Sequence, residues 1–179
     1  MKRPAVFLDR DNTLNIDPGY LSDPDALELF DDVPEGLARL KKCGFLLLVL
    51  SNQSGIGRGY YTAADARAVN AKINTILPRE AAIDAFYFCP HTPEEGCSCR
   101  KPAPGLLEQA CRDFDVDLKH SFMIGDKESD VLLGRQAGLK TLLLNREGLR
   151  KETEADKEVS SFTEAVEWIL SRFPSEDNS

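Results

Sequence analysis

The chain has 179 residues, 42% of them hydrophobic and 29% charged, and a formal net charge of -8 at pH 7. The length suits one globular domain, and the acidic balance argues against binding nucleic acid or an anionic membrane through bulk electrostatics. No apolar run approaches the ~20 residues of a membrane helix, and the first residues do not form a signal peptide. We expect one cytoplasmic domain over residues 1–174 (with a metal-binding loop at 89–99) and a tail over 175–179.

Short apolar runs alternate with helical patterns along the chain. The runs are continuously apolar, which is typical of strands covered on both faces in a parallel sheet. This alternation predicts a βαβ sandwich with right-handed crossovers. The charged stretch 147–160 is expected to be a loop. The predicted strands are 5–8, 45–50, 85–88, 121–124 and 141–144.

The predicted helices carry start and stop signals. Pro34 opens the first helix and Gly44 ends it, whereas Thr62 and Asp65 form a capping box for the second. Pro104 opens the third helix, Gly138 ends the fourth, and a fifth closes the chain. The inward positions expected on these helices are Leu37, Leu40 and Cys43; Ala66, Val69, Ile73 and Leu77; Leu107, Ala110, Cys111 and Phe114; Val131 and Leu132; and Phe162, Val166, Ile169 and Phe173.

Carboxylates follow the first and fourth predicted strands, and the ligand crevice of such sheets lies outside the carboxyl ends of the strands. Asp9 and Asp11 could converge on one cation or divide the roles of nucleophile and acid. A solvated turn explains that pair equally well when it is taken alone. Asp126 and Asp130, with Lys127 between them, lie where a site for a hard cation such as Mg²⁺ could be completed.

Groups able to bind phosphate lie in two further segments. Residues 51–54 and the glycines within 55–59 offer hydroxyl, amide and backbone N–H groups, although a loop with positive φ would also explain the glycines. Arg58 fits a surface charge better than an anion contact. Arg100 and Lys101 precede a helix, where two cations oppose the macrodipole unless an anion lies between them. A phosphate site is therefore favoured there over a structural pair.

A cluster of soft and borderline ligands precedes these cations. Cys89, His91, Cys97 and Cys99 lie within eleven residues of one polar loop. Three cysteines and one histidine form a closed structural zinc set that leaves no position for catalytic water. Chance clustering explains four such ligands in so short a loop less well. Zinc would replace a hydrophobic core for a loop too small to fold alone.

The segments FLDRDNT, LSNQSG, RKP and IGDKESD resemble, in this order, the four motifs of the haloacid dehalogenase-like phosphatases. The resemblance spans residues 6–145. It implies an α/β fold, a Rossmann-like three-layer sandwich with a central parallel sheet, and an aspartyl-phosphate mechanism. Asn12 stands where the usual pattern has glycine, and we expect activity to survive because Asn tolerates unusual backbone angles.

The resemblance also implies roles for individual residues. Asp9 would be the nucleophile, and Asp11 would protonate the leaving alcohol and then deprotonate the hydrolytic water. Mg²⁺ would be held by Asp9, the Asp11 carbonyl and Asp126, with Asp130 orienting the metal shell. The phosphoryl oxygens would be bound by Ser51 and Lys101.

The zinc loop narrows the resemblance to the branch of heptose 1,7-bisphosphate and histidinol-phosphate phosphatases, which lack a large cap domain. The segments 17–20 and 52–59 look more like the heptose enzymes, whereas the short interval between His91 and Cys97 looks more like the histidinol-phosphate enzymes. The resemblance favours the heptose bisphosphate as substrate, with histidinol phosphate or another small metabolite as the alternative. The residues implied to contact substrate are Arg10, Asp17, Pro18, Gly19, Tyr20, Asn52, Gln53, Ser54, Arg100 and Lys127.

A protein of another class remains as an alternative. A phospho-accepting or zinc-bearing interaction domain without turnover, such as a receiver domain, also uses strand-end acids and a lysine. Such a domain needs neither Asp11 as an acid nor the zinc loop. We therefore expect a monomeric enzyme with Mg²⁺ and Zn²⁺ as cofactors and a small phosphorylated metabolite, favoured to be a sugar bisphosphate, as its partner.

Overall fold

The computed structural model describes residues 1–149 and 152–173, and its centre is a parallel sheet of six strands in the order β3-β2-β1-β4-β5-β6. The tail expected at 175–179 lies outside the described residues. The predicted Rossmann-like arrangement is confirmed, because this strand order is that of a doubly wound sheet. The strands are β1 (Ala5–Leu8), β2 (Leu46–Asn52), β3 (Ala85–Cys89), β4 (Phe122–Gly125), β5 (Lys140–Leu144) and β6 (Lys157–Val159).

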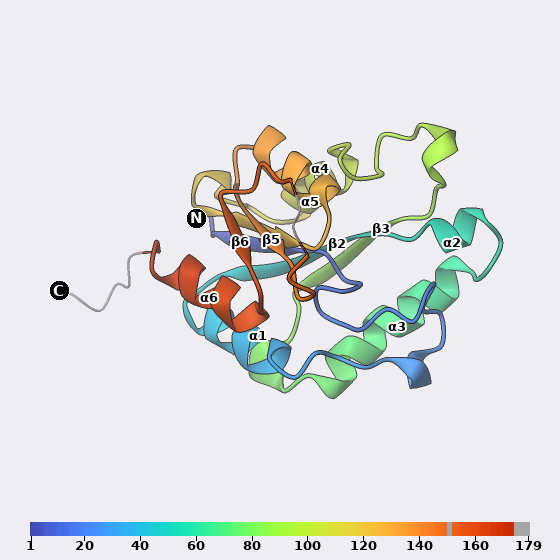
Figure 1. The fold of residues 1–179 in the computed structure, drawn as a ribbon, viewed down its shortest axis with the longest axis horizontal. Helices are drawn as coiled ribbons and strands as arrows, with labels where there is room; N and C mark the ends of the chain where they lie inside the picture. Colours follow the sequence, from blue (N-terminus) through green and yellow to red (C-terminus); the bar gives the residue numbers. More distant parts are fainter. Residues whose placement is uncertain (150–151, 174–179) are drawn as a thin grey trace.

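Helices cover both faces of the sheet (Figure 1). One face carries α1 (Val33–Lys42), α3 (Ala63–Ile76) and α6 (Phe162–Leu170), and the other carries α4 (Gly105–Asp113) and α5 (Glu128–Gln136). A short helix, α2 (Ser54–Gly57), lies beyond the carboxyl end of β2. Single 3₁₀ turns occur at η1 (Pro24–Ala26), η2 (Arg79–Ala81), η3 (Pro93–Glu95) and η4 (Leu118–His120).

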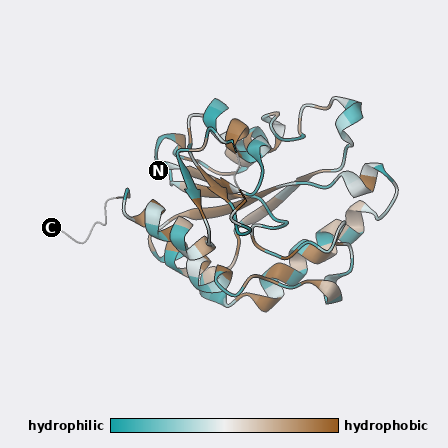
Figure 2. Ribbon diagram, viewed as in Figure 1, coloured by the Kyte–Doolittle hydropathy of each residue, from teal (hydrophilic) through white to brown (hydrophobic). Residues whose placement is uncertain are grey.

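The apolar strands are buried on both sides, as their continuous hydrophobicity predicts. In β1, Val6 and Leu8 belong to the core beneath α1 and α6, whereas Ala5 and Phe7 belong to the core beneath α4. Figure 2 shows these hydrophobic strands between the two helical layers, whose outer faces are more polar. None of the helices in the described part of the chain is long and apolar enough to cross a membrane.

Most predicted helix signals are confirmed, and three expectations are wrong. Leu132, expected to face inward, is only partly buried, because the buried face of α5 passes through Val131 and Leu133 instead. The capping box of Thr62 and Asp65 opens α3, and Gly44 follows α1 with a φ of 88°. Cys43 is exposed instead of lying in the core, because it follows the last residue of α1 and the apolar face ends before it. The predicted loop 147–160 contains β6, which pairs with β5 at the sheet edge.

The chain topology determines where a ligand crevice forms. From β1 the chain moves outward to β2 and β3, and it then crosses back to β4 on the other side of β1. The strand order reverses between β1 and β4, and in doubly wound sheets ligands bind outside the carboxyl ends of the strands at such a switch point. Asp9 and Asp126 directly follow these two strands.

Candidate active site

Three carboxylates meet at the switch point. Asp9, Asp126 and Asp130 each offer an oxygen, and these oxygens all lie within 4.8 Å of one another. Burial and the Asp9 carboxylate raise the pKa of Asp126 to about 8. Carboxylate oxygens are ligands that Mg²⁺ prefers, and a divalent cation here would offset the concentrated negative charge. The residues present therefore fit a magnesium site.

The Lys101 ammonium bridges two of these carboxylates, Asp9 and Asp130. Its Nζ lies 2.7 Å from Oδ1 of Asp9 and 2.7 Å from Oδ1 of Asp130, and it donates to the Leu50 carbonyl at 2.6 Å. Burial alone would raise the pKa of Asp9, but the Lys101 ammonium, the hydrogen bond with Asp126 and the charge of Lys127 together outweigh it and hold that pKa below the usual range. Asp9 is therefore ionised at neutral pH, as a carboxylate nucleophile must be.

Asp11 is held by side chains from several segments. Its Oδ1 accepts from Nε of Arg10 at 3.1 Å and from Nδ2 of Asn15 at 3.1 Å. Its Oδ2 accepts from Nη2 of Arg10 at 3.2 Å and from Nε2 of Gln53 at 2.9 Å. These donors fix the orientation of a carboxylate whose side chain is still 19% exposed. Asp11 is thus both fixed in place and accessible from solvent.

The residues that end β2 are bound mainly to other protein groups. Ser51 is buried, and its Oγ accepts from Nε2 of Gln53 at 2.5 Å. The Asn52 side chain bonds both backbone groups of Lys101, donating to the carbonyl at 3.2 Å and accepting from the N–H at 3.0 Å. Asn52 and Gln53, predicted to contact substrate, therefore have side chains that are already engaged within the protein.

Arg10, also predicted to contact substrate, is fully buried. Besides Asp11, its guanidinium donates to Oε1 of Gln53 at 3.2 Å and to Oδ1 of Asn70 at 3.1 Å. The side chain is thus directed into the protein, behind Asp11. This geometry does not support direct contact between the guanidinium and a ligand, because its partners are protein side chains.

The predicted substrate loop 17–20 is hydrogen-bonded at its first residue to Asn12, which has an unusual backbone conformation. Asn12 has a φ of 61°, and its Oδ1 accepts from the backbone N–H of Asp17 at 3.2 Å. Asn12 therefore adopts the left-handed conformation that the glycine of the usual pattern would adopt easily. The Tyr20 ring packs edge-on against Tyr60 with ring centroids 4.9 Å apart, and both rings are exposed.

The other predicted contact residues differ in their exposure to solvent. Lys127 is exposed and precedes α5, while Ser54 is half-buried at the start of α2. Arg100 is half-buried, and its Nη1 donates to the His91 carbonyl at 3.4 Å. Arg58 is exposed, in line with the surface-charge interpretation.

The glycines after β2 serve close packing and one turn. A Cβ on Gly55 would come within 2.2 Å of the Tyr61 ring, and one on Gly57 within 2.9 Å of the Pro90 carbonyl oxygen. Gly59 has a φ of 74°. The positive-φ explanation thus holds for Gly59, whereas the other two permit close approach.

The four ligands of the predicted zinc loop converge. The Cys99 Sγ lies 3.1 Å from the Cys89 Sγ, 3.6 Å from the Cys97 Sγ and 3.3 Å from the His91 Nδ1. A tetrahedron with zinc–ligand bonds of 2.0–2.3 Å has edges of about 3.3–3.8 Å, so the spacing is close to that of a zinc site. Desolvation would raise the pKa of the Cys97 thiol, but the backbone N–H groups of Cys99 and Arg100 lower that pKa to about 6. This thiol is therefore largely ionised at neutral pH, whereas burial raises the pKa of the Cys89 and Cys99 thiols.

The predicted zinc loop is hydrogen-bonded to the segment that follows β2, at the carboxyl ends of the strands. The backbone N–H of Gln53 donates to the Cys89 carbonyl at 2.8 Å, and that of Gly57 donates to the Pro90 carbonyl at 2.8 Å. The segment between β3 and α4 extends away from the sheet at the right of Figure 1. Because Arg100 and Lys101 directly follow Cys99, the loop fixes where these cations enter the site.

Sequence reasoning missed two residues that touch this machinery. The Tyr61 hydroxyl donates to Oε1 of Gln53 at 2.5 Å, and Asn70 accepts from Arg10. Neither belongs to a recognised motif. A signal for Asn70 did exist, since it lies four residues after Ala66 and three before Ile73 on the inward face of a helix.

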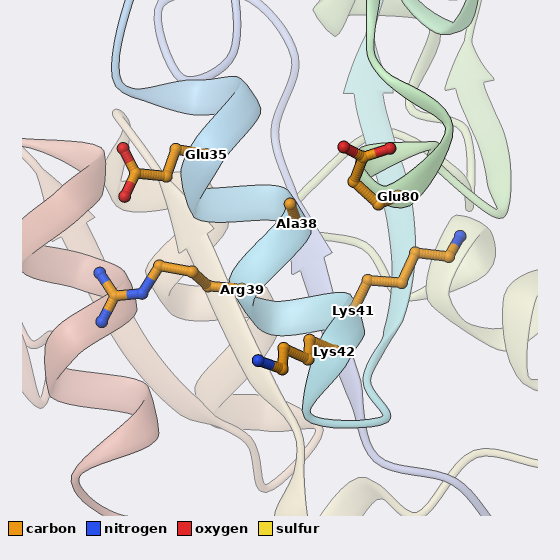
Figure 3. Close-up of a pocket in the computed structure, with 6 residues that line it drawn as sticks. All are labelled: Glu35, Ala38, Arg39, Lys41, Lys42 and Glu80. Atoms are coloured by element: carbon orange, nitrogen blue, oxygen red, sulfur yellow. The ribbon is translucent and has the colours of Figure 1, made fainter.

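A separate hollow of about 500 Å³ lies on the outer surface of α1. Figure 3 shows Arg39, Lys41 and Lys42 projecting from that helix, with Glu80 nearby. The three basic residues belong to the end of α1 that leads into the amino end of β2, opposite the carboxyl ends where the carboxylates meet, and Glu80 lies in η2. None of the predicted site residues lines it.

Comparisons with known proteins agree with this geometry. The HAD-hydrolase-like family model matches residues 98–168. Over 167 residues the chain is 42% identical to the D-glycero-beta-D-manno-heptose-1,7-bisphosphate 7-phosphatase of Helicobacter pylori strain J99, covering 92% of this chain and 96% of that protein. It is 37% identical over 175 residues to the protein of the same name from Escherichia coli K12, covering 93% and 88%.

A solved structure matches as well. The D,D-heptose 1,7-bisphosphate phosphatase from B. bronchiseptica, complexed with magnesium and phosphate, superposes with a TM-score of 0.81 at 29% identity. The superposition covers 95% of this chain and 99% of that chain. These matches confirm the predicted fold and the predicted family resemblance.

Proposed function

The chain belongs to the haloacid dehalogenase-like phosphatase family, and we propose that it removes the 7-phosphate of D-glycero-D-manno-heptose 1,7-bisphosphate through an aspartyl phosphate formed on Asp9. The observation that carries this proposal is the convergence of Asp9, Lys101 and the Asp126–Asp130 pair at the switch point of the sheet. The similarity to heptose bisphosphate phosphatases over most of the chain supports the choice of substrate.

The chemistry divides between Asp9 and Asp11. The Asp9 carboxylate attacks phosphorus, the bond from phosphorus to the leaving oxygen breaks, and Asp11 gives that oxygen its proton. Asp11, now a carboxylate, takes a proton from the water that attacks the phosphorus of the aspartyl phosphate. Inorganic phosphate leaves and the Asp9 carboxylate is regenerated.

Charged and polar residues stabilise the transferring phosphoryl group. Lys101, already 2.7 Å from Asp9, brings a permanent cation to the attacked phosphate, and the Ser51 hydroxyl can donate to a phosphoryl oxygen. Mg²⁺ held by Asp9, Asp126 and the Asp11 carbonyl would offset the repulsion between carboxylate and phosphate. Asp130 holds Lys101 and orients the metal shell.

Specificity for a bisphosphate would come from cations at the rim of the site. With a net charge of -8, the protein as a whole repels an anionic substrate, so local positive groups must attract it. Arg100 and Lys127 lie beside the phosphate-binding groups, and an arginine can hold the phosphate that is not cleaved through two parallel hydrogen bonds. The loop 17–20 would contact the sugar.

We also assign a structural zinc ion to Cys89, His91, Cys97 and Cys99, supported by the near-tetrahedral spacing of their ligand atoms. Such an ion would hold in place the loop that delivers Arg100 and Lys101. We further propose that the protein acts as a monomer in the cytoplasm. Size-exclusion chromatography with light scattering tests the monomeric state.

The test of the proposed function is phosphate release with Mg²⁺ across a panel that includes both anomers of heptose 1,7-bisphosphate and histidinol phosphate, with Asp9→Asn as the control. A kcat/KM for the heptose bisphosphate at least about a hundredfold above that for histidinol phosphate supports the proposal. The short interval between His91 and Cys97 favours histidinol phosphate as the second candidate, and the reverse ranking would assign it. A folded, metal-loaded protein that hydrolyses no phosphate ester would instead be a binding domain.

A further inference from the structure

The side-chain amide of Gln53 has a fixed orientation. Its Oε1 accepts from Nη2 of Arg10 at 3.2 Å and from the Tyr61 hydroxyl at 2.5 Å. A guanidinium can only donate, so the oxygen of the amide must face Arg10. The amide nitrogen must then face the opposite side, where it donates to Oδ2 of Asp11 at 2.9 Å and to Oγ of Ser51 at 2.5 Å.

This orientation has consequences for two groups of the reaction. Because the Ser51 oxygen accepts from Gln53, the hydroxyl hydrogen of Ser51 is left to donate to a phosphoryl oxygen. The same amide holds Oδ2 of Asp11, the carboxyl group that exchanges protons with the leaving alcohol and with water. Both donors of the Gln53 amide are thus used to arrange neighbouring residues.

Two residues outside the recognised motifs hold this arrangement from behind. Tyr61 directly precedes the N-cap residue of α3, and Asn70 is on α3 itself. Asn70 is buried, and its Oδ1 accepts from Nη1 of the fully buried Arg10 at 3.1 Å. A buried cation needs such acceptors, and the direction of each acceptor fixes the plane of the guanidinium.

We propose that Tyr61 and Asn70 are positioning residues of the phosphatase reaction: Tyr61 acts through Gln53, and Asn70 acts through Arg10, to fix Asp11 and the Ser51 hydroxyl. This inference rests on the proposed function, since it assigns Asp11 the role of acid and base. Burial raises the pKa of Tyr61 to about 12, so its hydroxyl remains protonated and can donate.

The first test is Tyr61→Phe, which removes the hydroxyl and keeps the ring that packs against Gly55. Tyr87→Phe is the matched control, because Tyr87 is also buried and donates to a side chain, Oδ2 of Asp113 at 2.8 Å, in the core beneath α4. For each variant, kcat/KM is measured with an alkyl phosphate and with an aryl phosphate. The alkyl leaving group needs a proton from Asp11, whereas the aryl group leaves without one.

We expect Tyr61→Phe to lower kcat/KM about tenfold for the alkyl ester, the worth of one buried hydrogen bond, and about threefold for the aryl ester. Tyr87→Phe should leave the ratio of the two values unchanged. Equal losses with both esters, or no loss with either, would overturn the role of Tyr61. The thermal unfolding midpoints of the two variants show whether an effect comes from stability alone.

The second test is Asn70→Ala, with Asn74→Ala as its control one turn further along α3. The Asn74 side chain bonds the backbone N–H and carbonyl of Ile83, both at 2.9 Å, so its loss affects stability away from the site. We expect only Asn70→Ala to show the greater loss with the alkyl ester. The same ester ratio in both variants would overturn the role of Asn70. A wild-type protein inactive on every ester would contradict the proposed function instead.

Discussion

The Asn52 side chain forms two hydrogen bonds with the backbone of Lys101: its Nδ2 donates to the Lys101 carbonyl at 3.2 Å, and its Oδ1 accepts from the Lys101 N–H at 3.0 Å. The two residues are 49 positions apart: Asn52 ends β2, and Lys101 lies between the predicted zinc loop and α4. This pair of bonds fixes where the Lys101 side chain begins, and its ammonium then reaches Asp9 and Asp130. The chain connects its second and third motifs through this contact.

Replacing Asn52 should therefore affect catalysis more than folding. We expect Asn52→Ala to lower kcat/KM about tenfold or more, because Lys101 would no longer be held against the attacked phosphate. Asn74→Ala, which removes the same kind of two-bond contact to the backbone of Ile83, should lower stability without this loss. Steady-state kinetics and urea unfolding of both variants separate the two effects. Unchanged kcat/KM in Asn52→Ala would contradict this role.

Asp32 should make stability depend on pH. Its carboxylate pairs with Arg146 at 3.0 Å and accepts from the backbone N–H of Phe162 at 2.7 Å. Burial would raise the pKa of Asp32, but the bonds from Arg146 and from the start of α6 outweigh it, so the pKa lies below its usual value. A depressed pKa in the folded state stabilises the protein above the unfolded value of about 3.9 and loses that effect as pH falls through the folded value.

Asp32→Asn should accordingly cost about 1–2 kcal/mol of unfolding free energy at pH 7, and this difference should shrink below about pH 4. Urea unfolding at pH 7 and pH 3 measures it. Asp31→Asn makes the same change of charge at an exposed neighbour and should cost less than about 0.5 kcal/mol. A cost for Asp32→Asn that persists unchanged at pH 3 would rule out the ionised carboxylate as its source.

Zinc removal should affect activity as well as stability. Cys99 is both a predicted zinc ligand and the neighbour of Arg100, so Cys99→Ser should lose the metal and misplace the cations that follow. We expect zinc content near zero, an unfolding midpoint lower by about 5 °C or more, and kcat/KM lower by about tenfold. Cys111→Ser, on α4 outside the loop, should retain zinc and activity. A Cys99→Ser protein with full zinc content would refute the ligand assignment.

Asn12 should tolerate glycine better than alanine. At a φ of 61°, alanine experiences the steric penalty of the left-handed region, whereas glycine does not. Both changes remove the bond to the backbone of Asp17. Asn12→Ala should therefore be less stable than Asn12→Gly by about 1 kcal/mol in urea unfolding. Equal stabilities would show that the backbone angle carries no cost here.

Much of this site follows from the sequence because its residues lie beside the strand ends. Asp9, Ser51 and Asp126 each come at the end of an apolar run, and the rule for ligand crevices in doubly wound sheets brings such ends together. The four zinc ligands are similarly close in sequence. Closeness in sequence, together with the rule that ligands bind at the carboxyl ends of the strands, was therefore sufficient to predict these clusters.

The features that were missed depend on contacts between distant segments. Asn70 reaches Arg10 across 60 positions, and its inward spacing on α3 predicts burial without indicating this partner. The strand β6 has only Val159 buried, since an edge strand paired on one side needs no apolar run. The spacing of Cys43 predicted a place on the apolar face of α1, but the helix ends one residue before it.

The most direct measurement of the central claim is mass spectrometry of Asp11→Asn after acid quenching of its reaction with an aryl phosphate. The aryl group leaves without a proton from residue 11, but hydrolysis of the aspartyl phosphate on Asp9 needs the missing base. The phosphoenzyme should therefore accumulate to nearly one phosphoryl group per chain, located on the peptide that contains Asp9. A quenched protein that carries no phosphoryl group, or carries it on another residue, would contradict the account.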